Sequence, residues 1–452
     1  MAARTRVNFV SRATPWDHPA TSLYTDHYEL TMLQAALHSG AAHRRSVFEV
    51  FTRRLPEGRR YGVVAGTGRL LEGLAHFRFG QEQLDALRAA GVVDDTTLAW
   101  LADFRFTGNI WGYAEGEAYF PSSPILIVEG TFAEACILET YLLSVLNHDS
   151  AIASAASRMT GAAGSRPCIE MGSRRTQEES AVAAARAAII GGFATTSNLE
   201  AGRRYGLRTV GTAAHSFTLL HDSEPEAFAA QVAALGKGTS LLVDTYDVEQ
   251  GVRNAVAAGG PDLGAVRLDS GDLVEQARWV RQLLDDLGNH QTRIVVTSDL
   301  DEYAIGLLAS APVDSYGVGT SLVTGSGAPT AGMVYKLVSR TDDDGAFVSV
   351  AKAAKNKTSV GGRKYALRRL NESGRAVAEV LGIGSHPYDD GNDRTLLHQF
   401  VADGEVLPGW TGPEGVQRAV ERHRQSMAEL PGSVMRLQRG EPAIPTEYEE
   451  ST

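Results

Sequence analysis

Between about residues 124 and 325, short runs rich in β-branched residues alternate with Ala- and Glu-rich amphipathic segments. This alternation is typical of βα units around a parallel sheet, and it constrains the fold more than any other feature of the chain. Strands are predicted to begin near Ile125, Cys168, Phe193, Thr209, Ser240, Ala265, Ile294 and Tyr316. Apolar residues at three- and four-residue spacing predict helices over Gln177 to Ile190, Pro225 to Leu235, Val248 to Ala258, Leu273 to Leu287 and Asp301 to Leu308.

The runs from residue 168 onward end in polar tips, which read GSRR, TTSN, AHSF, DTYD, LDSGD, TSDLD and GVGT in chain order. Parallel strands of a barrel share one C-terminal rim, so these tips are expected to face a common pocket. We therefore predict an α/β fold with an irregular α/β barrel over residues 124–335. A doubly wound open sheet is the alternative, and it also gathers ligands at the C-terminal ends of its strands.

The two ends of the chain have a different pattern, with mixed strands and helices and with hairpin-like turns at residues 120–124 and 341–345. Residues 1–123 and 336–452 are therefore predicted to form the two parts of one accessory α/β domain.

The chain carries a formal net charge of −11, which argues against general binding to nucleic acid or to an anionic membrane. Any phosphate must therefore be held locally. Two cysteines, Cys136 and Cys168, are too few for a disulfide framework or a cysteine-rich zinc site, which fits a reducing cytoplasm.

The N-terminal segment with Arg4, Arg6 and Arg12 lacks the apolar stretch of a signal peptide and is interpreted as a frayed tail. No run reaches the ~18 uncharged apolar residues of a membrane helix. We expect a soluble cytoplasmic protein.

The tip GVGT follows an apolar run at the last predicted barrel strand. Backbone N–H groups at Gly317 and Gly319 and the hydroxyl of Thr320 suit a phosphate, and barrels commonly hold phosphates at this place. A tight turn is the alternative reading of the same residues.

Carboxylates cluster at three neighbouring tips. Asp244 and Asp269 lie at strand ends and are candidate ligands for Mg²⁺, which takes few protein oxygens and relies on substrate phosphates for the rest. Asp247, Asp272 and Asp301 each precede a predicted helix, so N-capping is the expected role for them.

Arg174 and Arg267 lie at the same rim, where a guanidinium needs an anionic partner such as a carboxylate or a phosphate. An internal ion pair of Arg267 with Asp269 or Glu170 is the structural alternative. His215, in the tip AHSF, is a candidate general base, metal ligand or phosphoryl acceptor.

Six segments in order resemble nicotinate phosphoribosyltransferase over about three quarters of the chain. They are TDHYELTM at 25–32, FEVFTRRLPEGRRYGVVAG at 48–66, EMGSRR at 170–175, GTAAHSF at 211–217, VRLDSGDL at 266–273 and GVGTSLVTGSGAPTAGMVYKLV at 317–338. The resemblance implies an irregular barrel of the type II phosphoribosyltransferase kind, an accessory domain from both termini, and a homodimer with sites at its interface.

The resemblance also implies roles for single residues. Tyr28 and Thr212 would line a nicotinate pocket with Arg267, and Thr320 would hold the phosphate of phosphoribosyl pyrophosphate. Arg174 would be a further anion contact, and His215 would be phosphorylated by ATP.

One departure concerns Met171, since related enzymes often carry there an aromatic residue that stacks on the pyridine ring. Methionine can still pack on a ring through its polarizable sulfur.

The predicted reaction is displacement of pyrophosphate from phosphoribosyl pyrophosphate by nicotinate, which gives nicotinate mononucleotide for NAD synthesis. Two alternatives are a nicotinamide phosphoribosyltransferase and a non-catalytic sensor of phosphoribosyl ligands. The tip Thr195 to Asn198 offers hydroxyls and an amide where an amide-reading carboxylate is expected, which favours nicotinate. His215, Asp269 and Arg267 together speak against a sensor, since a sensor needs no phosphoryl acceptor.

Overall fold

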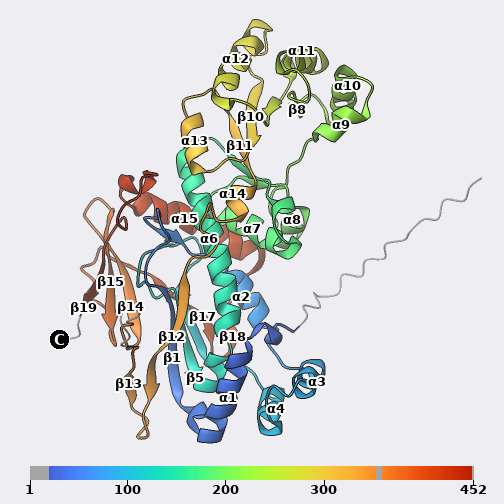
Figure 1. The fold of residues 1–452 in the computed structure, drawn as a ribbon. Coiled ribbons are helices and arrows are strands. Elements are labelled where there is room, and N and C mark those ends of the chain that lie inside the picture. The colour runs from blue at the N-terminus through green and yellow to red at the C-terminus, as the bar shows by residue number, and fades with distance from the viewer. Residues whose placement is uncertain (1–19, 353–358, 450–452) are drawn as a thin grey trace, which may run out of the picture.

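A computed structural model describes residues 20–352 and 359–449 of the chain, and the predicted N-terminal tail lies outside these ranges. Its helices are α1 His27–Ser39, α2 Thr67–Leu74, α3 Gln81–Ala89, α4 Asp95–Ala102, α5 Phe132–Cys136, α6 Glu139–Ala163, α7 Glu178–Ile190, α8 Leu199–Tyr205, α9 His215–Leu220, α10 Glu224–Leu235, α11 Val248–Gly259, α12 Leu273–Asp286, α13 Glu302–Leu308, α14 Thr320–Val323 and α15 Gly412–Glu429. Figure 1 shows the resulting elongated molecule, with α6 running along its middle.

Six strands form a parallel sheet in the order β7-β6-β11-β10-β9-β8. Their bounds are β6 Cys168–Glu170, β7 Thr195–Thr196, β8 Ser240–Leu242, β9 Ala265–Leu268, β10 Arg293–Ser298 and β11 Ser315–Val318. All six begin within two residues of a predicted position, and the predicted strand at Thr209 is a single parallel bridge to Thr196. The predicted helices of this region are likewise present as α7, α10, α11, α12 and α13.

The order of these strands is cyclic, because the last strand, β11, pairs directly with the first, β6. Within the described ranges, no hydrogen-bonded pairing joins the two outer strands β7 and β8. The fold is therefore α/β with a parallel sheet whose ladder of hydrogen bonds stays open at one place.

A second sheet is antiparallel and combines both ends of the chain in the order β13-β12-β1-β5-β3-β17-β18. Its strands are β1 Arg45–Thr52, β3 Asn109–Tyr113, β5 Leu126–Thr131, β12 Met333–Thr341, β13 Phe347–Ser349, β17 Leu397–Ala402 and β18 Glu405–Val406. The strand predicted near Ile125 is β5, and its place in this sheet corrects the prediction that it opens the parallel one. It joins this sheet because it is hydrogen-bonded to β1 and β3 on its two sides.

Two smaller sheets complete the fold, in the orders β16-β14-β15-β19 and β2-β4. Their strands are β14 Lys364–Leu370, β15 Ala376–Ile383, β16 Arg394–Thr395, β19 Thr446–Glu449, β2 Gly62–Val63 and β4 Ala118–Tyr119.

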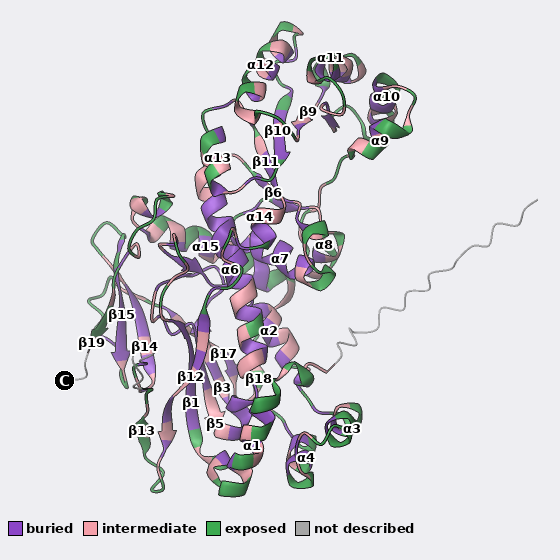
Figure 2. Cartoon of the chain, in the orientation of Figure 1, coloured by how far each residue is buried: buried purple, intermediate pink, exposed green. Residues whose placement is uncertain are grey.

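Helix α6 joins the two main cores of the molecule. Tyr141, Leu142 and Leu146 in its first half pack in the core of the antiparallel sheet, whereas Ile152 and Met159 pack in the core of the parallel sheet. Figure 2 shows much of α6 and α7 buried. No helix in the described part of the chain has the length and apolar character needed to cross a bilayer.

Glu117, just before β4, holds the C-terminal helix against the N-terminal part of the chain. Its buried carboxylate accepts hydrogen bonds from Arg394 at 2.8 and 3.1 Å and lies 3.3 Å from Arg422 of α15. Burial raises the pKa of Glu117, but Arg394, Arg368 and Arg422 outweigh it and lower that pKa from 4.5 to about 2. The difference corresponds to about 3 kcal/mol of stability at neutral pH.

Glu117→Gln is therefore expected to lower the melting temperature at pH 7, since three guanidinium groups lose their shared anion. The depressed pKa contributes stability that is fully present above pH 4.5 and is lost as the pH falls toward about 2. The difference in melting temperature between the two proteins should shrink over that window. Glu414→Gln, which breaks the exposed pair with Arg418, is the control and should change little. An equal effect of Glu117→Gln at pH 7 and pH 3 would contradict this role.

Candidate active site

The C-terminal ends of the six parallel strands lie at one edge, and they carry the polar tips noted in the sequence. Asp244 follows β8, Arg267 and Asp269 lie at the end of β9, Thr297 lies on β10, and Gly317 lies on β11. The parallel register aligns Val295 with Arg267. The tips therefore form one continuous rim.

Asp244 organises the part of this rim that follows β8 and β9. Its Oδ2 accepts the backbone N–H of Asp269 at 3.0 Å and the hydroxyl of Ser270 at 2.8 Å. Its Oδ1 is buried and has no hydrogen-bond partner among the described residues. Because a buried carboxylate oxygen without a partner is costly, this atom is suited to a cation.

His215 is the first residue of α9 and lies next to Asp244. Its Nε2 is 3.9 Å from Asp244 Oδ1, and its Nδ1 is 3.1 Å from the hydroxyl of Thr245. The imidazole side chain is 41% exposed, so it is held by the rim yet remains open to a ligand.

Arg267 points its guanidinium into the same rim, where Nη1 donates a hydrogen bond to Thr212 Oγ1 at 3.1 Å. Its Nε is buried without a partner, and no ion pair with Asp269 or Glu170 forms within 4 Å among the described residues. Burial lowers the pKa of the Arg267 guanidinium. The negative charges of Asp269 and Asp244 oppose this decrease, whereas the positive charge of Arg174 adds to it. The alternative of an internal ion pair is thus not realised, and an anionic ligand would satisfy the free donor.

Glu170 is occupied by structural hydrogen bonds at the end of β6. Its carboxylate accepts the backbone N–H of Gly172 and the hydroxyl of Thr196 on β7. Burial raises its pKa, and these two hydrogen bonds oppose the rise. Glu170 thereby positions the turn that carries Met171 and Arg174, and it ties this turn to the neighbouring tip.

Two glycines allow this turn to approach β11. A Cβ on Gly317 would lie 2.8 Å from the sulfur of Met171, and one on Gly172 would lie 2.2 Å from Val323 of α14. Met171 therefore packs directly on the strand that leads into Gly319 and Thr320, the first residue of α14.

Some residues of the rim were not singled out from the sequence. Thr297 donates its hydroxyl hydrogen to Asp269, and Ser270 and Thr245 contact Asp244 and His215. No local sequence signal marks Thr297 as a partner of Asp269, because the contact follows from the parallel register, which places Val296 beside Leu268.

The predicted helix caps are confirmed. Asp247 accepts the N–H of Gln250, and Asp272 accepts the N–H of Glu275. Asp301 accepts the N–H groups of two residues in α13. Because capping uses one oxygen of each carboxylate, it accounts for these three acids without a ligand.

Tyr28 is not brought to this rim. It lies on α1, which Figure 1 places at the opposite end of the molecule from α9 and β8. Its ring is 47% exposed and lies beside Glu139, and burial together with Glu139 raises the pKa of its hydroxyl. Within one chain, Tyr28 and the rim are separate.

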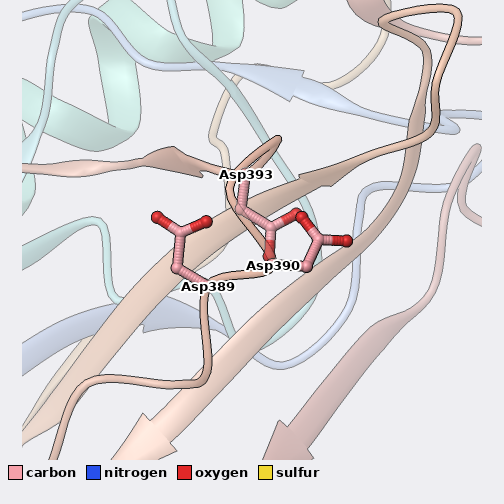
Figure 3. A group of neighbouring side chains, drawn as sticks. All are labelled: Asp389, Asp390 and Asp393. Carbon is pink, nitrogen blue, oxygen red and sulfur yellow. The ribbon is translucent and has the colours of Figure 1, made fainter.

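Three carboxylates outside the rim, at Asp389, Asp390 and Asp393, have oxygens within 4.8 Å of one another (Figure 3). Asp389 and Asp390 each accept a backbone N–H two residues further along the chain. Asp393 accepts hydrogen bonds from Arg369 and from the N–H of Leu370. These bonds account for the cluster as part of a turn.

Comparison with known proteins gives consistent matches. The family model of the nicotinate phosphoribosyltransferase (NAPRTase) N-terminal domain matches residues 23–147. Nicotinate phosphoribosyltransferase pncB1 of Mycobacterium tuberculosis is 55% identical over 441 residues, which cover 96% of each protein. Nicotinate phosphoribosyltransferase of Bacillus subtilis is 37% identical over 392 residues, which cover 84% of the chain and 79% of that relative.

Among solved structures, human nicotinic acid phosphoribosyltransferase resembles the fold with a TM-score of 0.78 at 24% identity. The match covers 94% of the chain and 98% of the human protein. The arrangement of sheets described above is therefore that of a known α/β fold.

Proposed function

The chain belongs to the nicotinate phosphoribosyltransferase family, and from this premise we propose how its residues divide the work of that activity. It is a transferase of NAD biosynthesis that acts on nicotinate and phosphoribosyl pyrophosphate. The observation that carries the assignment of the site is the half-buried guanidinium of Arg267, whose Nη1 donates to the Thr212 hydroxyl and whose buried Nε has no hydrogen-bond partner among the described residues. A nicotinate carboxylate bound there would satisfy that donor.

The Gly317 to Thr320 tip holds the phosphate of the ribose 5-phosphate unit, and Arg174 is a further contact for an anion. Support comes from the close packing of Met171 and Gly172, which precede Arg174 in the chain, on Gly317, Gly319 and α14. The charge of Arg174 also acts on Arg267, so the positive groups share one part of the rim.

Mg²⁺ fits the carboxylates of Asp244 and Asp269, because Oδ1 of Asp244 is buried and accepts no hydrogen bond from residues 20–352 or 359–449. Hard cations prefer such oxygen ligands. When bound, the ion neutralises charge on the departing pyrophosphate. Asp244 also fixes the backbone of Asp269, and Thr297 orients the Asp269 carboxylate.

The reaction is displacement at the anomeric carbon of the ribose. The bond from this carbon to the pyrophosphate oxygen breaks while the pyridine nitrogen forms the new bond, and no proton is transferred. Arg267 and Thr212 orient the acceptor, and Met171 packs against its ring. The protein thus contributes position and charge neutralisation to an oxocarbenium-like transition state.

Nicotinate fits this pocket better than nicotinamide does. In the Thr195 to Asn198 tip, the buried Thr196 hydroxyl donates to Glu170 and accepts the N–H of Asn198, and the Asn198 amide donates to Ser173 at 3.0 Å. The nearby Glu170 carboxylate is already occupied by Gly172 and Thr196, so no free carboxylate reads an amide there.

The finer description of the fold is also a proposal. The cyclic strand order, with β11 beside β6, supports an irregular barrel of the type II phosphoribosyltransferase kind. We assign the barrel to residues 124–335 without β5 and the start of β12, and the accessory domain to residues 1–123 and 336–452 together with these two segments, because both pair in the antiparallel sheet. A cytoplasmic location is proposed from the substrates of the reaction.

Arg267→Lys is expected to raise the KM for nicotinate about ten-fold and the KM for phosphoribosyl pyrophosphate much less, because lysine keeps the charge but loses the planar fork. The measurement is initial-rate formation of nicotinate mononucleotide, with nicotinamide assayed beside it at equal concentration. Arg293→Lys, at the opposite end of the sheet, is the matched control. Equal effects on both substrates would refute the role of Arg267 in acceptor binding, and faster use of nicotinamide by the unaltered enzyme would refute the choice of acceptor.

Tyr28 reaches an active site only if a second subunit supplies it, so we propose a homodimer in which Tyr28 of the partner subunit completes the rim. Mixing two inactive variants, Tyr28→Ala and Arg267→Ala, then restores one intact site in each mixed dimer. Random exchange of subunits should return about a quarter of the normal activity, because half of the dimers are mixed and each mixed dimer has one intact site and one defective site. Activity that stays at the sum of the two variants, or a fully active monomer, would contradict the shared site.

We further propose that ATP phosphorylates His215. The imidazole nitrogen attacks the γ-phosphorus, the bond to the ADP oxygen breaks, and water later releases the phosphate. The exposed imidazole beside Asp244 supports this, since added negative charge there would alter how the rim holds Mg²⁺ and pyrophosphate.

His215→Asn is expected to abolish stimulation by ATP and acid-labile protein phosphate, and to leave slow transfer without ATP because Arg267 and the Gly317 to Thr320 tip are unchanged. The measurement is nicotinate mononucleotide formation with and without ATP, together with phosphate incorporation from labelled ATP. His221→Asn, just after α9, is the control and should retain both properties. Full stimulation in His215→Asn would assign His215 a positioning or structural role instead.

A further inference from the structure

A buried cluster of three charged residues lies behind the tip that we assign to the phosphate. Glu302, the first residue of α13, accepts hydrogen bonds from Arg59 at 2.9 Å and from Arg158 of α6 at 3.0 Å. All three side chains are at most 5% exposed. They come from three distant parts of the chain, so the cluster forms only in the folded molecule.

The cluster is connected to the turn that ends α14. Arg59 Nη2 donates to the carbonyl of Gly325 at 2.8 Å and to that of Ser326 at 3.3 Å, and the Ser326 hydroxyl donates to the second oxygen of Glu302. One guanidinium and one carboxylate therefore hold both the backbone and the side chain of this turn.

This turn needs such support because its backbone is strained. Gly325, Ser326 and Gly327 have φ values of 67°, 50° and 82°, so three consecutive residues adopt the left-handed region. Glycine tolerates that region, whereas Ser326 does so only when the surrounding contacts hold it. Ser326 also donates its N–H to the carbonyl of Ser321, within α14.

Helix α14 has four residues and follows Gly319 directly, so it has little rigidity of its own. The orientation of the N–H groups at Gly319 and Thr320 depends on what fixes the other end of this short helix. At that end are the strained turn and, through it, Arg59 and Glu302.

We propose that Arg59 and Glu302 are positioning residues for binding of the ribose 5-phosphate group of phosphoribosyl pyrophosphate. They fix the turn at residues 325–327 and thereby the N–H and hydroxyl donors of the Gly317 to Thr320 tip. The inference rests on the proposed phosphate role of that tip. Neither residue touches the substrate. Because Glu302 directly follows the TSDLD tip that carries Thr297, the same cluster also links the phosphate tip after β11 to the neighbouring tip after β10.

Arg59→Lys is the primary test. Lysine keeps a positive charge near Glu302 but cannot also reach the carbonyls of Gly325 and Ser326 with a planar fork. We expect the KM for phosphoribosyl pyrophosphate to rise about ten-fold through misplacement of the tip, and the KM for nicotinate to stay within about two-fold. Ser326→Ala removes only the hydroxyl bond to Glu302, so it tests the same link by a smaller change and should shift the same constant in the same direction.

Two further variants separate the possible outcomes. Glu379→Gln breaks a comparable buried ion pair, that of Glu379 with Arg368 in the sheet of β14 and β15. Both side chains of this pair are 0% exposed. The substitution should lower the melting temperature and leave both KM values unchanged, which shows what loss of a buried ion pair does by itself. Thr320→Val alters the phosphate tip directly and should raise the KM for phosphoribosyl pyrophosphate.

A selective rise for Arg59→Lys, Ser326→Ala and Thr320→Val supports the proposal. If Thr320→Val alone has the selective effect, while Arg59→Lys and Ser326→Ala change both KM values equally or neither, the positioning role is overturned and the phosphate tip stands. If Thr320→Val leaves the KM for phosphoribosyl pyrophosphate unchanged, the phosphate tip itself is overturned, and the positioning role with it.

Discussion

The parallel pairing of β11 with β6 is the constraint on which the rest of the site depends. It joins the last strand of the βα series to the first, so the tips after these strands become neighbours although about 150 residues separate them in the chain. Without this pairing, Met171 and Gly172 would not approach Gly317 and Gly319. Residues 172 and 317 are glycines at places where the close approach of the two tips leaves no room for a Cβ.

Buried charge explains which groups at the rim are left for ligands. Glu170 is occupied by a backbone N–H and a hydroxyl, and Glu302 by two arginines and a serine. Buried polar atoms in a folded protein are normally paired in this way. Asp244 Oδ1 and Arg267 Nε are buried at the rim and have no hydrogen-bond partner in the part of the chain that the structure describes. One needs a cation and the other an anion, which matches an acceptor carboxylate and a metal-bound pyrophosphate.

Local features of the sequence predicted much of this architecture. Strand starts, helix caps and the polar tips are set by residues close in the chain, and β6 to β11 and the capping aspartates follow those expectations. The assignment of β5 to the parallel sheet was wrong, because an apolar strand does not reveal which sheet it joins. The contacts of Thr297 with Asp269 and of Arg59 with Glu302 were out of reach for a similar reason, since they depend on register and on packing between distant segments. The role of Tyr28 rests on the resemblance alone, because within one chain Tyr28 lies on α1, away from the rim.

The central claim is that acceptor, ribose phosphate and metal-bound pyrophosphate share the rim at the C-terminal ends of β6 to β11. A crystal structure of the protein with nicotinate mononucleotide tests it most directly. We expect the pyridine carboxylate at Arg267 and Thr212, the phosphate at Gly317 to Thr320, and Tyr28 of the partner subunit beside the ring. The chain also contains a cavity of about 700 Å³ lined by Arg69, Tyr141 and His148, and by Gln177 at the start of α7. Nucleotide bound in that cavity, with the rim empty, would contradict the account.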